Sequence, residues 1–170
     1  MRLALNVGYW GTTGTDDLNG MLALSKAADE HHYDVVWLAE AYGSDIPSLT
    51  GYLAAHTQNV GYGAAIMQIP GRTPAMIAMT AATLDRITGG RFHLGLGVSG
   101  PQVSEGWHGV RFADPLGRTR EYVEIVRQAL QRAFWGSDKT LDSLSLRRAL
   151  WHGQRTPRRS VRQRGASDAT

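Results

Sequence analysis

Residues 95–100 read GLGVSG, a glycine-rich segment that follows an apolar run and matches the pattern G-x-G-x-x-G. In dinucleotide-binding proteins this pattern forms a tight turn after a strand, and its third glycine opens a helix whose N-terminus binds the pyrophosphate. Here Gly100 is followed by Pro101 and by a stretch rich in glycine, proline and polar residues, in which we predict a loop and no helix. The sequence therefore favours a different use for these glycines.

Four apolar runs spaced along the chain predict the fold. We expect strands at residues 3–8, 34–38, 60–67 and 91–98, and each is followed by a segment with helical spacing of its apolar residues. The helices are expected to begin near residues 15–17, at 46, at Thr73-Pro74 and at Asp114-Pro115, and the last should carry Val123, Val126, Leu130 and Phe134 on one face. Four βα units in succession predict a parallel α/β sheet, either doubly wound or part of a (β/α)8 barrel.

Two neighbouring strands of this predicted sheet end in small residues. The third ends near the stretch Gly61-Tyr62-Gly63-Ala64-Ala65-Ile66, and the fourth ends in the glycines of residues 95–100. Because binding sites of parallel α/β proteins gather at the carboxyl ends of the strands, a planar ring or a phosphate could lie there against bare backbone. The alternative is that the small residues only allow a helix to pack closely.

Charge and composition divide the chain into two parts. Residues 1–135 carry a net charge of −2 and residues 136–170 one of +5, because the second part is rich in arginine. We predict one folded domain over 1–135 and a largely disordered basic tail over 136–170, in which Leu141, Leu144 and Leu150 could form a short helix. The tail has no nucleic-acid reader motif, so nucleic-acid binding is not favoured. The absence of cysteine and of a long apolar run predicts a cytoplasmic protein with no membrane span.

The segments VVWLAEAYGSD (residues 35–45) and AAIMQIPGRTPAMIAMTAATLDRITGGRFHLGLGVSGPQVSEGWHGV (64–110) resemble the bacterial luciferase-like monooxygenase superfamily. Within it they are similar to the branch that uses a deazaflavin, coenzyme F-420, in place of FMN. The resemblance covers about residues 3–132 and implies a (β/α)8 TIM barrel. It implies an oxidoreductase that moves hydride between the deazaflavin and a small organic substrate, in a homo-oligomer. An FMN-dependent monooxygenase and a non-enzymatic remnant whose basic tail binds acidic partners stay open as alternatives.

The resemblance also implies which residues hold the cofactor. In relatives a non-proline cis peptide at the end of the third strand backs the ring, and it maps onto Ala65-Ile66. Gln68 follows this bulge. The loop after the fourth strand would border the ring with Gly97, Val98, Ser99, Gly100 and Gln102.

Three side chains are candidates for acid/base catalysis. Glu40 ends the second strand, but Ala41 stands where some deazaflavin dehydrogenases have a histidine, so a histidine mechanism at that position is not supported. Glu105 and His108 lie in the loop after the fourth strand and would act at the mouth, with Trp107 covering the ring. Packing of this loop is the alternative. No pair of histidines has metal-ligand spacing with a carboxylate partner, so no metal is predicted.

After about Phe134 the chain departs from the family pattern, which continues with four more βα units. We interpret the sequence as an N-terminal half-barrel with a non-homologous end, as an out-of-frame read or a truncated gene would give. On this interpretation the chain is inactive or binds its cofactor weakly unless two copies complement each other.

Overall fold

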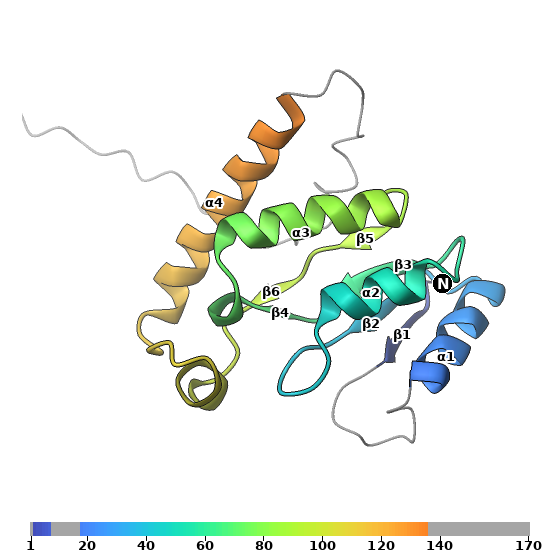
Figure 1. Ribbon diagram of the computed structural model, residues 1–170, viewed down its shortest axis with the longest axis horizontal. Helices are drawn as coiled ribbons and strands as arrows, with labels where there is room; N and C mark the ends of the chain where they lie inside the picture. The colour runs from blue at the N-terminus through green and yellow to red at the C-terminus, as the bar shows by residue number, and fades with distance from the viewer. Residues whose placement is uncertain (1, 8–17, 136–170) are drawn as a thin grey trace, which may run out of the picture.

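The computed structural model describes residues 2–7 and 18–135, with side chains as far as residue 131 (Figure 1). Four parallel strands form the main sheet in the order β1 (Ala4–Val7), β2 (Val35–Leu38), β3 (Gly61–Ala64) and β5 (Phe92–His93). The predicted helix start at residues 15–17, the basic tail and its helix at Leu141, Leu144 and Leu150 lie outside the described residues.

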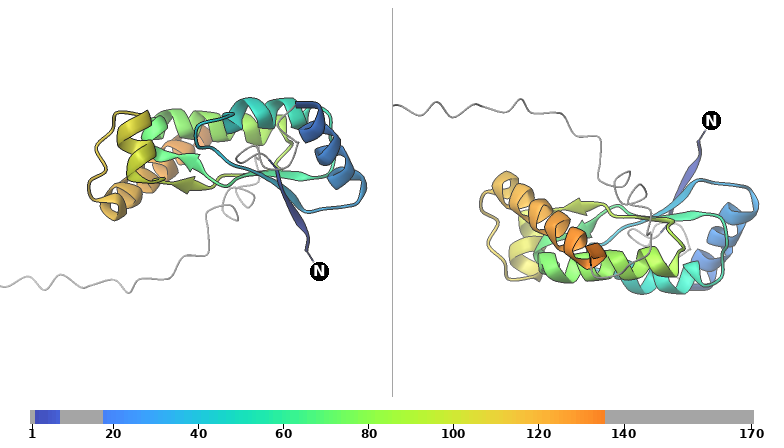
Figure 2. Two further views of the ribbon diagram at one scale, coloured as in Figure 1. Left: turned by 90° about the horizontal axis from the view of Figure 1, so that it is seen from below. Right: turned by 90° about the horizontal axis from the view of Figure 1, so that it is seen from above.

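A helix follows each of the four strands along the chain, which confirms the predicted order of βα units. The helices are α1 (Leu18–Glu30), α2 (Ile46–Ala54), α3 (Pro74–Ile87) and α4 (Pro115–Trp135). Helices α2 and α3 cover one face of the sheet, as Figure 2 shows, and α4 packs against α3. None of the helices in the described part of the chain is both long and apolar enough to cross a membrane.

The core lies between the sheet and these helices. One row of residues in register runs across the sheet from Leu5 through Val36 and Tyr62 to Phe92, and the last three are at most 1% exposed. Burying an apolar side chain of this size stabilises the fold by about 1.5–3 kcal/mol. The alternate positions of the same strands, including Trp37 and Gly63, point to the other face.

Helix α4 differs in detail from the predicted amphipathic pattern. Its buried face is formed by Tyr122, Val126 and Leu130, at the i, i+4, i+8 spacing of one helix face, while Val123 is only half-buried. Of the residues predicted to share one face, Val126 and Leu130 are buried, and Val123 is half-buried because the buried face is centred on Tyr122 at this turn. The side chain of Phe134 lies outside the described residues.

The predicted strands at 60–67 and 91–98 are each divided into two. Strand β3 stops at Ala64, and β4 (Met67–Gln68) begins beyond the Ala65–Ile66 peptide bond, which is cis and so confirms the cis peptide that the resemblance implied at this position. Strand β5 stops at His93, and β6 (Leu96–Gly97) begins beyond Gly95. Strands β4 and β6 pair in parallel as a separate two-stranded sheet, with Met67 opposite Leu96 and Gln68 opposite Gly97.

A short helix follows Gly100, where a loop without a helix was predicted. Residues Gln102–Trp107 form one π-helical segment, η2, so that prediction is wrong. The polar residues that favoured a loop stabilise the segment instead: Ser104 Oγ donates to the Val110 carbonyl at 2.7 Å, and Glu105 Oε1 accepts from the Phe112 N–H at 2.8 Å. In its first turn the N–H groups of Val103 and Ser104 donate to the Gly100 carbonyl and are therefore not available to a pyrophosphate.

Candidate functional site

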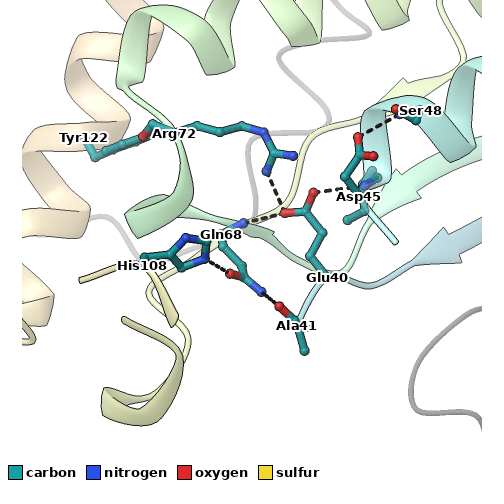
Figure 3. A network of polar contacts seen from close by, with 9 residues as sticks. Glu40, Ala41, Asp45, Ser48, Gln68, Arg72, His108 and Tyr122 are labelled. Atoms are coloured by element: carbon teal, nitrogen blue, oxygen red, sulfur yellow. Dashed lines mark hydrogen bonds and ion pairs between the residues drawn. The ribbon is translucent and has the colours of Figure 1, made fainter. Parts of the chain in front are cut away.

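A network of polar side chains lies where β2, β4 and β6 end (Figure 3). It joins Glu40 from the end of β2, Gln68 from β4, Arg72 from the segment before α3, and His108 from the end of η2. The carboxyl ends of parallel strands are the usual place for active sites in α/β proteins. The structure thus brings together three of the predicted site residues, Glu40, Gln68 and His108.

Glu40 uses both of its carboxylate oxygens within the protein. Oε1 accepts from the Ile46 N–H at 2.9 Å, and Oε2 accepts from the Gln68 N–H at 3.0 Å and from Arg72 Nη1 at 2.7 Å. The side chain of Glu40 is 6% exposed and that of Arg72 19%, so this ion pair is largely shielded from solvent. Glu40 therefore ties the start of α2, strand β4 and the start of α3 to the end of β2.

Gln68 is 2% exposed, and both ends of its amide are bonded. Nε2 donates to the Ala41 carbonyl at 3.0 Å, while Oε1 lies 2.6 Å from His108 Nε2. The ring of His108 lies over Gly71, where an added Cβ would come within 3.0 Å of His108 Cε1. Gly71 therefore leaves the space that the imidazole occupies.

Tyr122 connects α4 to this network. Its hydroxyl donates to the Arg72 carbonyl at 2.7 Å. Burial raises the pKa of Tyr122 to about 12, against a smaller opposing effect of Arg72 and Arg118. The hydroxyl is therefore protonated at neutral pH and available as the donor in this bond.

Beside the network, the residues that follow β3 and those at and after the end of β6 are mostly small. We call this surface the platform; it comprises Ala65, Ile66, Gly97, Val98, Ser99 and Gly100. Ala65 is exposed and the other five are half-buried. A Cβ at Gly97 would lie 2.6 Å from Ile66 Cδ1, so the two strand ends are in contact. Gln102 is exposed and lies next to Gly100, since its Oε1 would be 2.9 Å from a Cβ there.

The remaining predicted residues lie on η2. Glu105 is exposed, and its Oε1 accepts from the Phe112 N–H, which belongs to the loop that follows η2. Trp107 is 60% exposed and meets Tyr42 edge to face, with ring centroids 5.6 Å apart and an interplanar angle of 84°. Sequence reasoning missed the contact with Tyr42 and the pairing of Arg72 with Glu40, because both join residues distant in the chain.

A hollow of about 400 Å³ lies near the network but apart from the platform. Its lining includes Gly71, Arg72, Thr73, Arg118 and Glu121, so it opens between the start of α3 and α4. None of the platform residues lines it. Within residues 2–7 and 18–135, no group of three or more histidine, aspartate or glutamate side chains is placed to hold a metal ion.

The chain is an α/β protein with a parallel βα fold, and its polar network lies at the carboxyl ends of the strands, where α/β proteins usually have their sites. The family model described as luciferase-like monooxygenase matches residues 3–166, and the chain belongs to this family. A Mycobacterium tuberculosis protein named as a putative coenzyme F-420-dependent oxidoreductase is 48% identical over 132 residues. That match covers 78% of this chain and 37% of the relative, so the chain spans little more than a third of the relative's length.

Solved structures show the same fold at low sequence identity. The coenzyme F-420-dependent tetrahydromethanopterin reductase of Methanopyrus kandleri has a TM-score of 0.63 at 22% identity, over 75% of this chain and 39% of its own. The oxygenating constituent of 3,6-diketocamphane monooxygenase of Pseudomonas putida, solved with FMN, has a TM-score of 0.60 at 23% identity, over 76% and 37%. The described residues form part of the TIM-barrel fold of this family, which confirms the predicted fold class.

Proposed function

We propose that this chain carries the ring-binding half of a deazaflavin-dependent oxidoreductase, which moves hydride between coenzyme F-420 and a small organic substrate. The observation that carries the proposal is the platform: Ala65 is exposed, and the next residue, Ile66, packs against Gly97 at the carboxyl end of β6. The name of the Mycobacterium tuberculosis relative supports the choice of cofactor. Cytoplasmic location and homo-oligomeric state stay predictions.

The residues of the platform fit a flat ring. Ile66, which packs over Gly97, and Val98 offer apolar contact, and exposed Ala65 adds little bulk next to Ile66. A bound ring would be held by Ala65, Ile66, Val98, Ser99 and Gly100, with Gln102 beside them. A bound deazaflavin would supply the hydride chemistry, while the protein binds the ring and orients it.

The hydrogen bonds of the three predicted acid/base residues indicate different roles for them. Glu40 is saturated by three hydrogen bonds and favours a positioning role. His108 has Nε2 engaged by Gln68, which leaves Nδ1. Glu105 is exposed and keeps Oε2 without a hydrogen-bond partner in the described part of the chain, so we propose Glu105 as the group that exchanges a proton with substrate.

Replacing Ala65 by tryptophan should abolish deazaflavin binding. Ala65 is exposed, so the indole can be accommodated in the fold while it occupies the space of the ring. We expect saturable quenching of coenzyme F-420 fluorescence by the unaltered protein and at least a tenfold weaker affinity for Ala65→Trp. Ala55→Trp is the matched control, because Ala55 is also exposed but follows the end of α2, away from the platform. Equal affinity of Ala65→Trp and Ala55→Trp would remove the platform as the site.

FMN is the second candidate cofactor, because the structural neighbour from Pseudomonas putida was solved with it. Both cofactors carry a tricyclic ring and a phosphate, so the same platform fits either. The same titration repeated with FMN decides between them: tighter binding of FMN than of coenzyme F-420 would favour a monooxygenase.

A further inference from the structure

Five residues close a ring of contacts at the mouth of the site. The Ala41 carbonyl accepts from Gln68 Nε2, and Gln68 Oε1 meets His108 Nε2. His108 is adjacent in sequence to Trp107, which contacts Tyr42 edge to face, and Tyr42 is adjacent to Ala41. Gln68 therefore joins two segments, the end of β2 and the end of η2, that also touch through their aromatic side chains.

The partners of Gln68 determine the direction of each bond. A backbone carbonyl can only accept, so the Gln68 group facing Ala41 at 3.0 Å is the NH₂. The group facing His108 at 2.6 Å is then the amide oxygen, which also only accepts. The proton of this second bond must therefore reside on His108 Nε2.

We propose that Gln68 is a positioning residue, whose buried amide fixes His108 in the Nε2–H form and fastens η2 to the end of β2, so that Trp107 is held against Tyr42 beside the platform. Gln68 was predicted to contact the cofactor, but an amide with both ends bonded inside the protein and 2% exposure has little to offer a ligand. The role of the aromatic pair as a wall of the ligand site rests on the proposed function, whereas the fastening itself does not.

Two variants distinguish a role for the hydrogen bonds of Gln68 from a role for the packing of its side chain alone. Methionine has nearly the shape of glutamine but neither a donor nor an acceptor of comparable strength, so Gln68→Met keeps the packing and removes both bonds. Gln68→Glu keeps an acceptor for His108 and removes the donor to Ala41. Together, Gln68→Met and Gln68→Glu therefore distinguish the effect of the bond to His108 from the effect of the bond to Ala41. Gln58→Met is the matched control, because Gln58 is exposed and its side chain makes no hydrogen bond in the described structure.

The test is the protonation of the His108 ring, read from its ¹⁵N resonances in the cofactor-free protein at neutral pH, together with the ring-to-ring NOE between Tyr42 and Trp107. The unaltered protein and Gln58→Met should show a protonated Nε2 and the NOE. In Gln68→Met the ¹⁵N chemical shifts of His108 Nδ1 and Nε2 should move toward each other, as expected when the ring exchanges between its two tautomers, and the NOE should be lost. In Gln68→Glu Nε2 should stay protonated while the NOE weakens.

Two results would overturn the proposal. One is an unaltered protein in which His108 carries its proton on Nδ1 alone, a measurement that needs no variant to fold. The other is a folded Gln68→Met protein with an unchanged His108 ring and an unchanged Tyr42–Trp107 NOE. Failure of deazaflavin binding, with the His108 result as expected, would count against the proposed function and leave the role of Gln68 standing.

Discussion

Replacing Glu40 by alanine should lower the free energy of unfolding by about 3 kcal/mol, the cost of breaking a buried ion pair from one side. Arg72 would lose its partner while only 19% of its side chain is exposed, and the Ile46 and Gln68 N–H groups would lose their acceptor. The variant leaves a buried positive charge and two unpaired donors. Urea unfolding followed by circular dichroism measures the change.

A second variant and a control separate charge from packing. Adding Arg72→Met to Glu40→Ala should recover part of the loss, because the uncompensated guanidinium is removed as well. Arg2→Met is the control: Arg2 pairs with Asp34 at 3.4 Å, but 82% of its side chain is exposed, so its loss should cost well under 1 kcal/mol. A change for Glu40→Ala no larger than that for Arg2→Met would contradict the structural role of Glu40.

Replacing Gly95 by alanine should cost about 3 kcal/mol, at the upper end for overpacking. A Cβ at Gly95 would lie 2.0 Å from the Ala64 carbonyl oxygen, a backbone atom that cannot move without shifting the end of β3. The Gly95 carbonyl also accepts from the Met67 N–H at 2.9 Å. A displacement of the backbone at Gly95 would therefore also displace Met67, which follows Ile66 of the platform. We therefore expect lower stability and weaker binding of coenzyme F-420 together.

Gly51→Ala provides the comparison for this substitution. Gly51 lies inside α2, and a Cβ there would meet no atom within 4 Å. Alanine at such a helical position should stabilise the protein by about 0.5–1 kcal/mol. If Gly95→Ala unfolds at the same urea concentration as the unaltered protein, the close approach of β3 and the Gly95 turn is not as described.

The order of strands and helices could be predicted because each element carries its own local pattern. Thr73-Pro74 shows this best: the predicted helix start is the start of α3, where Thr73 Oγ1 accepts from the Met76 N–H at 3.3 Å. The resemblance implied the cis peptide at Ala65–Ile66 that ends β3, but the break of the fourth strand at Gly95 could not be predicted from a local pattern. Gly95 is required by the carbonyl of Ala64, which belongs to another strand, and nothing in the residues around Gly95 reveals that neighbour.

The candidate site was predicted residue by residue, but the roles of those residues depend on their partners. Glu40 reads from the sequence as an acid at a strand end, and only its contact with Arg72, 32 residues further on, indicates a positioning role. His108 likewise reads as an acid/base group until its bond to Gln68, 40 residues earlier, is known. The local sequence predicts which residues lie at the carboxyl ends of the strands. Contacts between residues distant in the chain decide which of them already have hydrogen-bond partners within the protein.

Mapping the backbone amides perturbed by coenzyme F-420 tests the central claim most directly, namely that the ring lies on the platform between the Ala65–Ile66 peptide bond and the residues at the end of β6. In ¹H–¹⁵N spectra recorded during a titration, the largest shifts should occur at Ala65, Ile66 and residues 97–100. The hollow between α3 and α4 offers a competing site with its own reporters, Arg118 and Glu121. Largest shifts at Arg118 and Glu121, with residues 65–66 and 97–100 unmoved, would contradict the account.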